Sequence, residues 1–134
     1  MWLAARLLPQ LGLDLPFRLA LAGSVGAVGL AIGLLAVAPF LRSRTTLDPR
    51  CPERVSALVT DGIYAVSRNP MYVAMLLALV AWGLYLDNGA ALAVAPPCFV
   101  LYLNRWQIEP EERALAAAFG DRYERYRRRV RRWF

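Results

Sequence analysis

The strongest constraint on this fold is a run of twenty-three residues, Leu19 to Leu41, that contains no charged side chain. As an α-helix rising 1.5 Å per residue it would reach about 34 Å, enough to cross the hydrocarbon core of a bilayer. Its four glycines, Gly23, Gly26, Gly29 and Gly33, fall on one side of such a helix. Because small residues let helix backbones approach closely, this side predicts a helix–helix contact.

Two shorter apolar stretches follow, from Met71 to Leu86 and from Gly89 to Leu103. The polar pair Asp87-Asn88 predicts a tight hairpin between them, so the two helices should be antiparallel neighbours. Both are short for a membrane span, and we expect flanking residues and local thinning of the bilayer to complete the crossing. Pro96-Pro97 predicts a kink in the last helix.

The composition agrees with an all-α integral membrane protein that has three transmembrane helices in one domain, residues 1–134. The chain is 58 % hydrophobic, which is too apolar for a small soluble domain, yet its net charge is +6 and all sixteen basic residues are Arg. The Arg residues concentrate in residues 42–68 and 121–134, whereas the hairpin at Asp87 has none. Basic segments favour the cytosolic side, so both should be cytosolic and the hairpin should face away.

Residues 1–16 are too short to add a full span and predict a partial or interfacial N-terminal helix. A signal peptide is not indicated, because Arg6 interrupts the apolar start and no small-residue cleavage site follows. Whether a further helix precedes Met1 is left open.

The last fourteen residues carry seven Arg against two acids. Tyr123, Tyr126, Val130 and Trp133 recur among them at helical spacing. This pattern predicts a cytosolic amphipathic helix lying on an anionic membrane surface. Nucleic-acid binding could be argued from the same charges, but a chain tethered to the bilayer makes it the weaker interpretation.

Several chemistries are excluded by the absence of His. Without His there is no imidazole base, no Ser-His or Cys-His pair and no His-based metal site. Cys51 and Cys98 are isolated, one in a charged segment and one in an apolar run, so neither a disulfide nor a metal site is expected.

One polar cluster precedes the second apolar stretch. Asn69 is a good N-cap and Pro70 suits the first helical position, so a helix should start here. Its unpaired N–H groups, with Arg68 beside them and Tyr72 on the first turn, could hold a carboxylate. An ordinary capped membrane helix, with Arg68 reaching to the interface, explains the same residues equally well.

A second polar cluster follows the third apolar stretch and contains Glu109, Glu111 and Glu112. Acidic residues favour the first turn of a helix, so one or two of them could cap a helix that begins near Pro110. Alternatively, a carboxylate with two oxygens could bond the two hydroxyls of a ribose.

Taken together, the two clusters resemble a family signature. The motifs are Gly62-x-Tyr64-x-x-x-Arg68-Asn69-Pro70-x-Tyr72 and Glu111-Glu112-x-x-Leu115-x-x-x-Phe119-Gly120-x-x-Tyr123-x-x-Tyr126-x-x-x-Val130. They are similar to those of the isoprenylcysteine carboxyl methyltransferase and phospholipid methyltransferase superfamily, here its bacterial-type integral membrane members. The resemblance covers residues 45–134 and implies an S-adenosylmethionine site at the cytosolic ends of the helices. The cofactor contacts that it implies are Ser56, Ala57, Leu58, Val59, Tyr64, Asn69, Pro70, Met71, Tyr72 and Glu111.

Two departures from the family pattern bear on the substrate. Asn69 replaces a His, which preserves hydrogen bonding but not titration. Gln107 stands where the family has the Arg that handles prenylcysteine, and Arg105 is a candidate to replace it. No residue is assigned a catalytic role; Arg68, Arg105 and Gln107 are positioning candidates, and Gln107 and Arg105 are also the substrate-binding candidates.

The resemblance implies methyl transfer to a small lipophilic acceptor at the cytosolic membrane face. A sulfonium methyl is already activated, so transfer requires positioning and dehydration more than an acid or a base. A carboxylate or thiolate acceptor is favoured because no proton need be removed from it. The alternatives are N-methylation of a phospholipid amine and a non-catalytic membrane scaffold; the expected partners are the bilayer and a lipophilic acceptor, with no metal and no nucleic acid.

Overall fold

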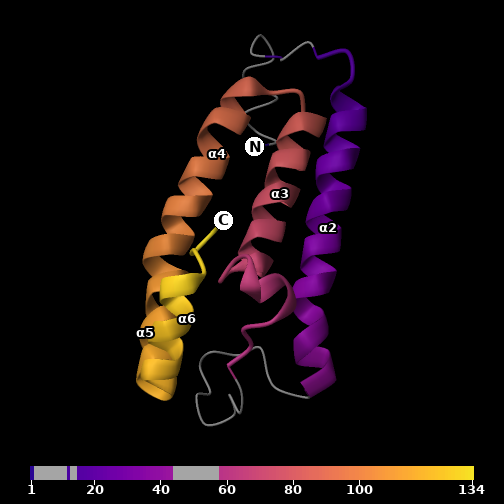
Figure 1. Cartoon of the computed structure of the whole chain (residues 1–134). Helices are drawn as coiled ribbons and strands as arrows, with labels where there is room; N and C mark the ends of the chain where they lie inside the picture. The colour runs from indigo at the N-terminus through magenta and orange to yellow at the C-terminus, as the bar shows by residue number, and fades with distance from the viewer. Residues whose placement is uncertain (2–11, 13–14, 44–57) are drawn as a thin grey trace.

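The computed structural model describes residues 1, 12, 15–43 and 58–134, and every regular element in this part of the chain is a helix (Figure 1). The prediction of an all-α fold is therefore confirmed. The N-terminal helix predicted for residues 1–16 lies outside the described residues except at Met1, Gly12, Leu15 and Pro16. One isolated parallel bridge, Ser67 to Arg131, is the only β-type pairing among the described residues.

Helix α2, Arg18–Ser43, contains the whole first apolar run and confirms that prediction. Over Arg18–Leu41 it is long and apolar enough to cross a membrane, and no other helix in the described ranges is. Large apolar side chains project from it without cover: Leu30 is 65 % exposed and Leu34 is 64 % exposed. A core helix of a soluble protein would bury such residues, so the surface of α2 suits a lipid environment.

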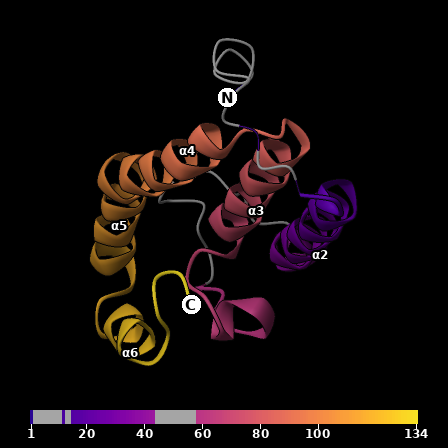
Figure 2. The same cartoon turned by 90° about the horizontal axis from the view of Figure 1, so that it is seen from above.

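Helix α3, Pro70–Tyr85, packs along α2 through the glycines of the first run (Figure 2). A Cβ added to Gly29 would lie 3.0 Å from the Cβ of Leu77 and 3.2 Å from the carbonyl oxygen of Ala74. Cβ atoms at Gly26 and Gly33 would meet α3 side chains at 3.7 and 3.4 Å. The predicted close contact is confirmed at these three glycines. The prediction was wrong for Gly23, where nothing lies within 4 Å.

The predicted hairpin joins α3 to helix α4, Gly89–Tyr102. Asn88 caps α4, since its side-chain Oδ1 accepts from the N–H of Ala91 at 2.8 Å, and Asp87 turns the chain with a φ of 54°. Arg18 at the start of α2 lies 3.3 Å from the Asp87 carboxylate, so this ion pair ties all three helices at one end. Helix α4 continues through both prolines, and the kink predicted there stays a prediction.

No loop separates α4 from the following polar cluster. A π-helical turn, Leu103–Ile108, joins α4 to helix α5, Glu109–Phe119, in one continuous rod. The N–H of Glu109 donates to the carbonyl of Asn104, five residues back. The wider turn accommodates Pro110, whose ring would clash with the carbonyl of Trp106 in a regular α-helix. The expected helix start near Pro110 is confirmed, because α5 begins at Glu109 and has Glu109, Glu111 and Glu112 in its first turn. The expectation that these acids cap it was wrong, because no side chain caps α5 and the π turn precedes it directly.

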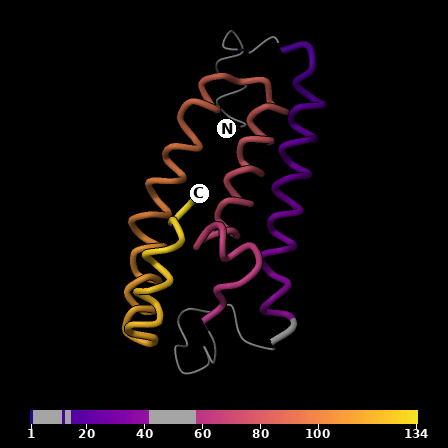
Figure 3. Tube along the Cα trace, in the orientation of Figure 1, coloured from indigo at the N-terminus to yellow at the C-terminus, as the bar shows by residue number. Residues whose placement is uncertain are grey.

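The chain reverses at Gly120, which has a φ of 50°, and helix α6, Asp121–Arg129, packs back along α5 (Figure 3). The apolar face of α6 is buried: Tyr123, Tyr126 and Val130 pack against Leu58 and against α5 residues Leu115, Ala116 and Phe119. The prediction of an amphipathic helix is confirmed. Its predicted placement with that face on the membrane was wrong, because the face already contacts protein, and Trp133 lies beyond the end of the helix.

Candidate active site

Four segments meet around the start of α3, at the opposite end of this helix from the hairpin. They are the 3-10 turn η3 (Gly62–Ala65), the first turn of α3, the π turn with α5, and the last residues of the chain. These segments carry most of the residues that the sequence marks as functional. Ser56 and Ala57 lie outside the described residues. Leu58 and Val59 are half-buried, and Leu58 packs against the buried face of α6.

Tyr72, Gln107 and Glu111 converge on one carboxylate oxygen. The Tyr72 hydroxyl donates to Glu111 Oε1 at 2.7 Å, and Gln107 Nε2 donates to the same oxygen at 2.6 Å. Glu111 thus joins the first turn of α3 to the π turn. Its Oε2 accepts from no described residue, so half of the carboxylate remains able to bind a ligand.

Tyr64, in η3, contacts two other helices, α2 and α6. Its hydroxyl donates to the Ala36 carbonyl of α2 at 3.3 Å and its ring meets Phe40 edge-on, with ring centroids 5.8 Å apart. The Tyr126 hydroxyl donates to the Tyr64 carbonyl at 2.7 Å. Burial, and secondly the negative charge of Glu111, raises the pKa of Tyr64 to about 12. The Tyr64 hydroxyl therefore remains protonated at neutral pH.

Asn69 precedes the first residue of α3, as predicted, but its side chain makes no cap. Nδ2 instead donates to the carbonyl of Arg132 at 2.9 Å, and the Asn69 N–H donates to Ser67 Oγ at 3.1 Å. Because one N–H of Nδ2 is engaged, Asn69 retains its Oδ1 acceptor and one further N–H for a ligand. Pro70 is buried and Met71 half-buried at the start of the same helix.

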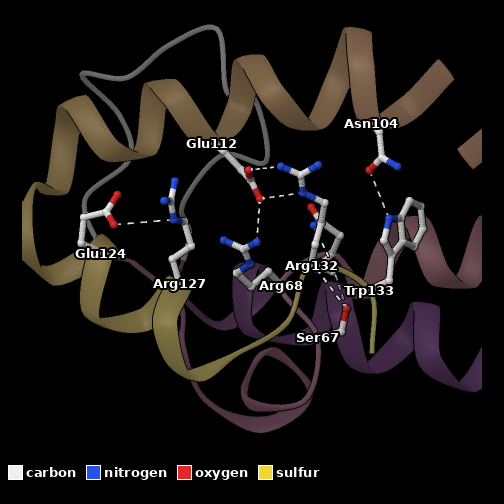
Figure 4. A network of polar contacts seen from close by, with 9 residues as sticks. Ser67, Arg68, Asn104, Glu112, Glu124, Arg127, Arg132 and Trp133 are labelled. Atoms are coloured by element: carbon white, nitrogen blue, oxygen red, sulfur yellow. Dashed lines mark hydrogen bonds and ion pairs between the residues drawn. The ribbon is translucent and has the colours of Figure 1, made fainter. Parts of the chain in front are cut away.

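Arg68 is not free at the interface but belongs to a buried ion network (Figure 4). Its Nη2 lies 3.1 Å from Glu112, and Arg132 donates to both oxygens of the same carboxylate, at 3.2 Å from Nε and 2.6 Å from Nη2. The Arg68 and Glu112 side chains are only 11 % and 12 % exposed. Nε and Nη1 of Arg68 are buried and have no hydrogen-bond partner among the described residues.

The two substrate candidates both have side-chain partners already. Arg105 is paired with Glu109 at 3.0 Å, on the surface, and is 69 % exposed. It therefore lies away from Tyr72 and Glu111, on a different side of the rod. Gln107 binds Glu111, a cofactor candidate.

Sequence reasoning did not foresee the ion pairs that Glu112 makes with Arg68 and Arg132. It also missed the hydrogen bond from Trp133 Nε1 to Asn104 Oδ1 at 3.1 Å. The Glu pair was noticed, but nothing in its spacing distinguished the two carboxylates. The arginines of the tail looked alike because only the fold brings one of them to Glu112. In the parts of the chain that the structure describes, no three His, Cys, Asp or Glu side chains gather as a metal site would require.

A helical bundle with an exposed apolar helix, whose polar end gathers Tyr, Asn and Glu side chains, is typical of a membrane-associated protein with a candidate ligand site at one end. The comparisons make this class specific. The model of the phospholipid methyltransferase family matches residues 17–122, and the chain belongs to this family. The resemblance inferred from the two motifs is thereby confirmed.

Three relatives illustrate the match. Over 112 residues the chain is 32 % identical to protein-S-isoprenylcysteine O-methyltransferase of Schizosaccharomyces pombe, covering 75 % of this chain and 46 % of the relative. It is 35 % identical over 79 residues to cobalt-zinc-cadmium resistance protein CzcN of Cupriavidus metallidurans, covering 59 % of this chain and 36 % of the relative. An uncharacterized protein of Haemophilus influenzae is 48 % identical over 64 residues, 47 % of this chain and 98 % of that protein.

The chain thus spans less than half the length of the Schizosaccharomyces and Cupriavidus relatives. No solved structure matches it.

Proposed function

We propose that the protein transfers a methyl group from S-adenosylmethionine to a small lipophilic acceptor at the cytosolic face of a membrane. The observation that carries this proposal is the carboxylate of Glu111, fixed through one oxygen by Tyr72 and Gln107 with its other oxygen unpaired among the described residues. Family membership and the name of the Schizosaccharomyces relative support methyl transfer as the reaction.

The residues present fit the cofactor that the family implies. Glu111 Oε2 is suited to ribose hydroxyls and Asn69 Oδ1 to an ammonium or amino group, because both are acceptors without a described partner. Tyr72 donates to the same carboxylate, and the negative charge of Glu111 adds to the effect of burial in raising the pKa of Tyr64. The remaining candidates are Ser56, Ala57, Leu58, Val59, Pro70 and Met71. S-adenosylmethionine would supply an activated methyl group, and these side chains would orient it and exclude water.

We further propose that α2, α3 and α4 all cross the bilayer, with the site and residues 121–134 on the cytosolic side. Two stacked aromatic pairs support this placement, Trp82 with Tyr85 and Tyr102 with Trp106, whose ring centroids lie 5.5 and 5.4 Å apart. All four residues are exposed, near opposite ends of the α3–α4 hairpin. Such aromatic residues anchor membrane proteins at both interfaces.

An anionic acceptor, a carboxylate or thiolate, needs a positive group near the methyl donor. Arg105 and Gln107 are engaged with Glu109 and Glu111, so Arg68 becomes the best candidate. It retains two unpaired buried donors, Nε and Nη1, whose burial costs free energy until a partner binds. An acceptor reaching them would have to displace the side chains that now cover the guanidinium.

A phospholipid amine is the second candidate acceptor, and a different observation favours it. Glu111 receives hydrogen bonds only from neutral groups among the described residues, so its negative charge is uncompensated locally. A negative site favours binding of a positively charged headgroup over an anionic one, and the bound ammonium must lose its proton before its nitrogen can accept the methyl group. The name of the family points to the same acceptor class.

Membranes containing the full chain should be incubated with S-adenosylmethionine carrying a labelled methyl group. Label released as methanol by mild base identifies a methyl ester, whereas base-stable label is assigned by mass spectrometry of the product to an S-methyl thioether or an N-methylated amine. Arg68→Lys is the informative variant, since it keeps a charge for Glu112 but loses the planar pair of free donors. If the purified protein shows no saturable binding of S-adenosylmethionine and no labelled product forms, the proposed function is wrong.

A further inference from the structure

Residues 126–132, near the end of the chain, are hydrogen-bonded to residues 64–69, which include the cofactor candidates Tyr64 and Asn69. We name these hydrogen bonds the tail clamp. It consists of four hydrogen bonds between the two segments: from the Tyr126 hydroxyl to the Tyr64 carbonyl at 2.7 Å, from the Arg68 N–H to the Arg131 carbonyl at 3.0 Å, and from Asn69 Nδ2 and Ser67 Oγ to the Arg132 carbonyl at 2.9 and 3.5 Å.

The clamp acts on both ends of the short connection between η3 and α3. Tyr64 lies at one end and Asn69 at the other, and both are candidates to contact the cofactor. The connection itself is not helical, so only the 3-10 turn and the start of α3 fix it locally. Apart from the bond between the Tyr64 hydroxyl and the Ala36 carbonyl of α2, the tail supplies the long-range polar contacts of these two residues.

Arg132 also links the tail clamp to α5. Its carbonyl accepts from Asn69, while its guanidinium donates twice to Glu112, the neighbour of Glu111 in α5. A single tail residue thus bridges the start of α3 and the start of α5. These are the two elements whose Tyr72 and Glu111 form the candidate cofactor contact.

We propose that Arg132 and Tyr126 are positioning residues that set the relative placement of Tyr64, Asn69 and Glu111, and thereby the affinity for the cofactor. This inference rests on the proposed function. Neither residue needs to touch the cofactor: Tyr126 is 4 % exposed and its hydroxyl is bonded to the Tyr64 carbonyl, and Arg132 faces Glu112.

The test is calorimetric binding of S-adenosylmethionine to the purified full chain in detergent, with the thermal midpoint measured on the same samples. Arg132→Ala and Tyr126→Phe should each weaken binding about tenfold, equivalent to about 1.4 kcal/mol. Arg132→Lys should give an intermediate loss, because Lys cannot donate bidentately. Arg127→Ala is the matched control, since it removes one Arg of α6 whose exposed pair with Glu124 lies at 3.5 Å.

A combined variant tests whether Arg132 acts through Glu112. Because Glu112→Gln also removes the pair with Arg68, the double variant should bind no more weakly than Glu112→Gln alone. If Arg132→Ala and Tyr126→Phe lower the thermal midpoint yet bind the cofactor like the wild type, the clamp is only structural and the inference fails. If Arg132→Ala does not fold, Arg132→Lys and Tyr126→Phe decide the matter. If the wild type itself does not bind, the proposed function fails first and the inference falls with it.

Discussion

Glu111 and Glu112 are neighbours in sequence with opposite surroundings. Glu111 accepts hydrogen bonds from the neutral side chains of Tyr72 and Gln107, whereas Glu112 is bound by Arg68 and Arg132. Successive helical residues point about 100° apart, so one carboxylate faces α3 and the other faces the tail. The first is available for a ligand and the second is committed to structure.

Glu111→Ala and Tyr64→Ala should each weaken S-adenosylmethionine binding about tenfold, or about 1.4 kcal/mol. Glu111→Ala removes the candidate ribose acceptor, and Tyr64→Ala removes another side chain that the family resemblance assigns to the cofactor. Glu109→Ala is the control, because Glu109 is also an acidic residue of α5 but pairs with Arg105 on the surface. Unchanged titration curves for both test variants would exclude this site.

Alkaline pH should destabilise the protein through its buried tyrosines. The pKa of Tyr64 is raised to about 12, and burial also raises that of Tyr126, whereas the unfolded value is about 10. Above pH 10 the unfolded chain loses protons that the folded chain keeps, so the stability present below pH 10 should decline from pH 10 to 12. Thermal midpoints measured across this range check the decline, and Tyr64→Phe should flatten it. A midpoint that stays constant to pH 12 would contradict the prediction.

At the scale of elements, the α2–α3 contact was predictable and the continuity of α4 with α5 was not. Uncharged runs set the bounds of the apolar helices to within one or two residues, because charges cannot be buried in such helices without partners. Asn104, Arg105 and Gln107 look like a loop in sequence, yet the π turn keeps them helical, with Gln107 bonded to Glu111. The amphipathic pattern of α6 predicts a buried face but cannot distinguish lipid from the residues of α5.

The α2–α3 contact should fail when its closest glycine is enlarged. Gly29→Leu places a branched side chain where a Cβ already lies 3.2 Å from a backbone oxygen of α3, which cannot move aside as a side chain can. We expect a loss of about 2 kcal/mol or more in stability, measured as the thermal midpoint in detergent. Gly23→Leu is the control, because no atom lies within 4 Å of its added Cβ. Equal midpoints for the two variants would show that the helices do not pack here.

At the scale of the whole molecule, the site could be predicted only through the resemblance. The motifs name Tyr64, Asn69, Tyr72 and Glu111, and the structure places Tyr72 against Glu111. The tail residues that complete the site are more than sixty residues away from Asn69 in sequence. No local pattern fixes such a pairing, because it depends on the reversal at Gly120 and on the extended backbone from Val130 onward.

The proposed topology can be tested by labelling single cysteines in a variant that lacks Cys51 and Cys98. Arg128→Cys lies on the exposed face of α6, which the proposed topology places on the cytosolic side. It should therefore react with an impermeant maleimide only after the membrane has been permeabilised. Asp87→Cys, in the hairpin, should react from outside in intact cells. Labelling of both positions from the same side would exclude three crossings with a cytosolic tail.

The unbroken rod from Gly89 to Phe119 has a mechanical consequence. In the proposed topology its first half, α4, lies in the bilayer, and its second half, α5, carries Glu111. We therefore expect a change in membrane thickness that tilts α4 to move α5 as well, and so to alter how Glu111 contacts Tyr72. Reconstituted in lipids of graded acyl-chain length, the protein should therefore show a cofactor affinity with an optimum thickness, so that the membrane acts as a regulator as well as a solvent.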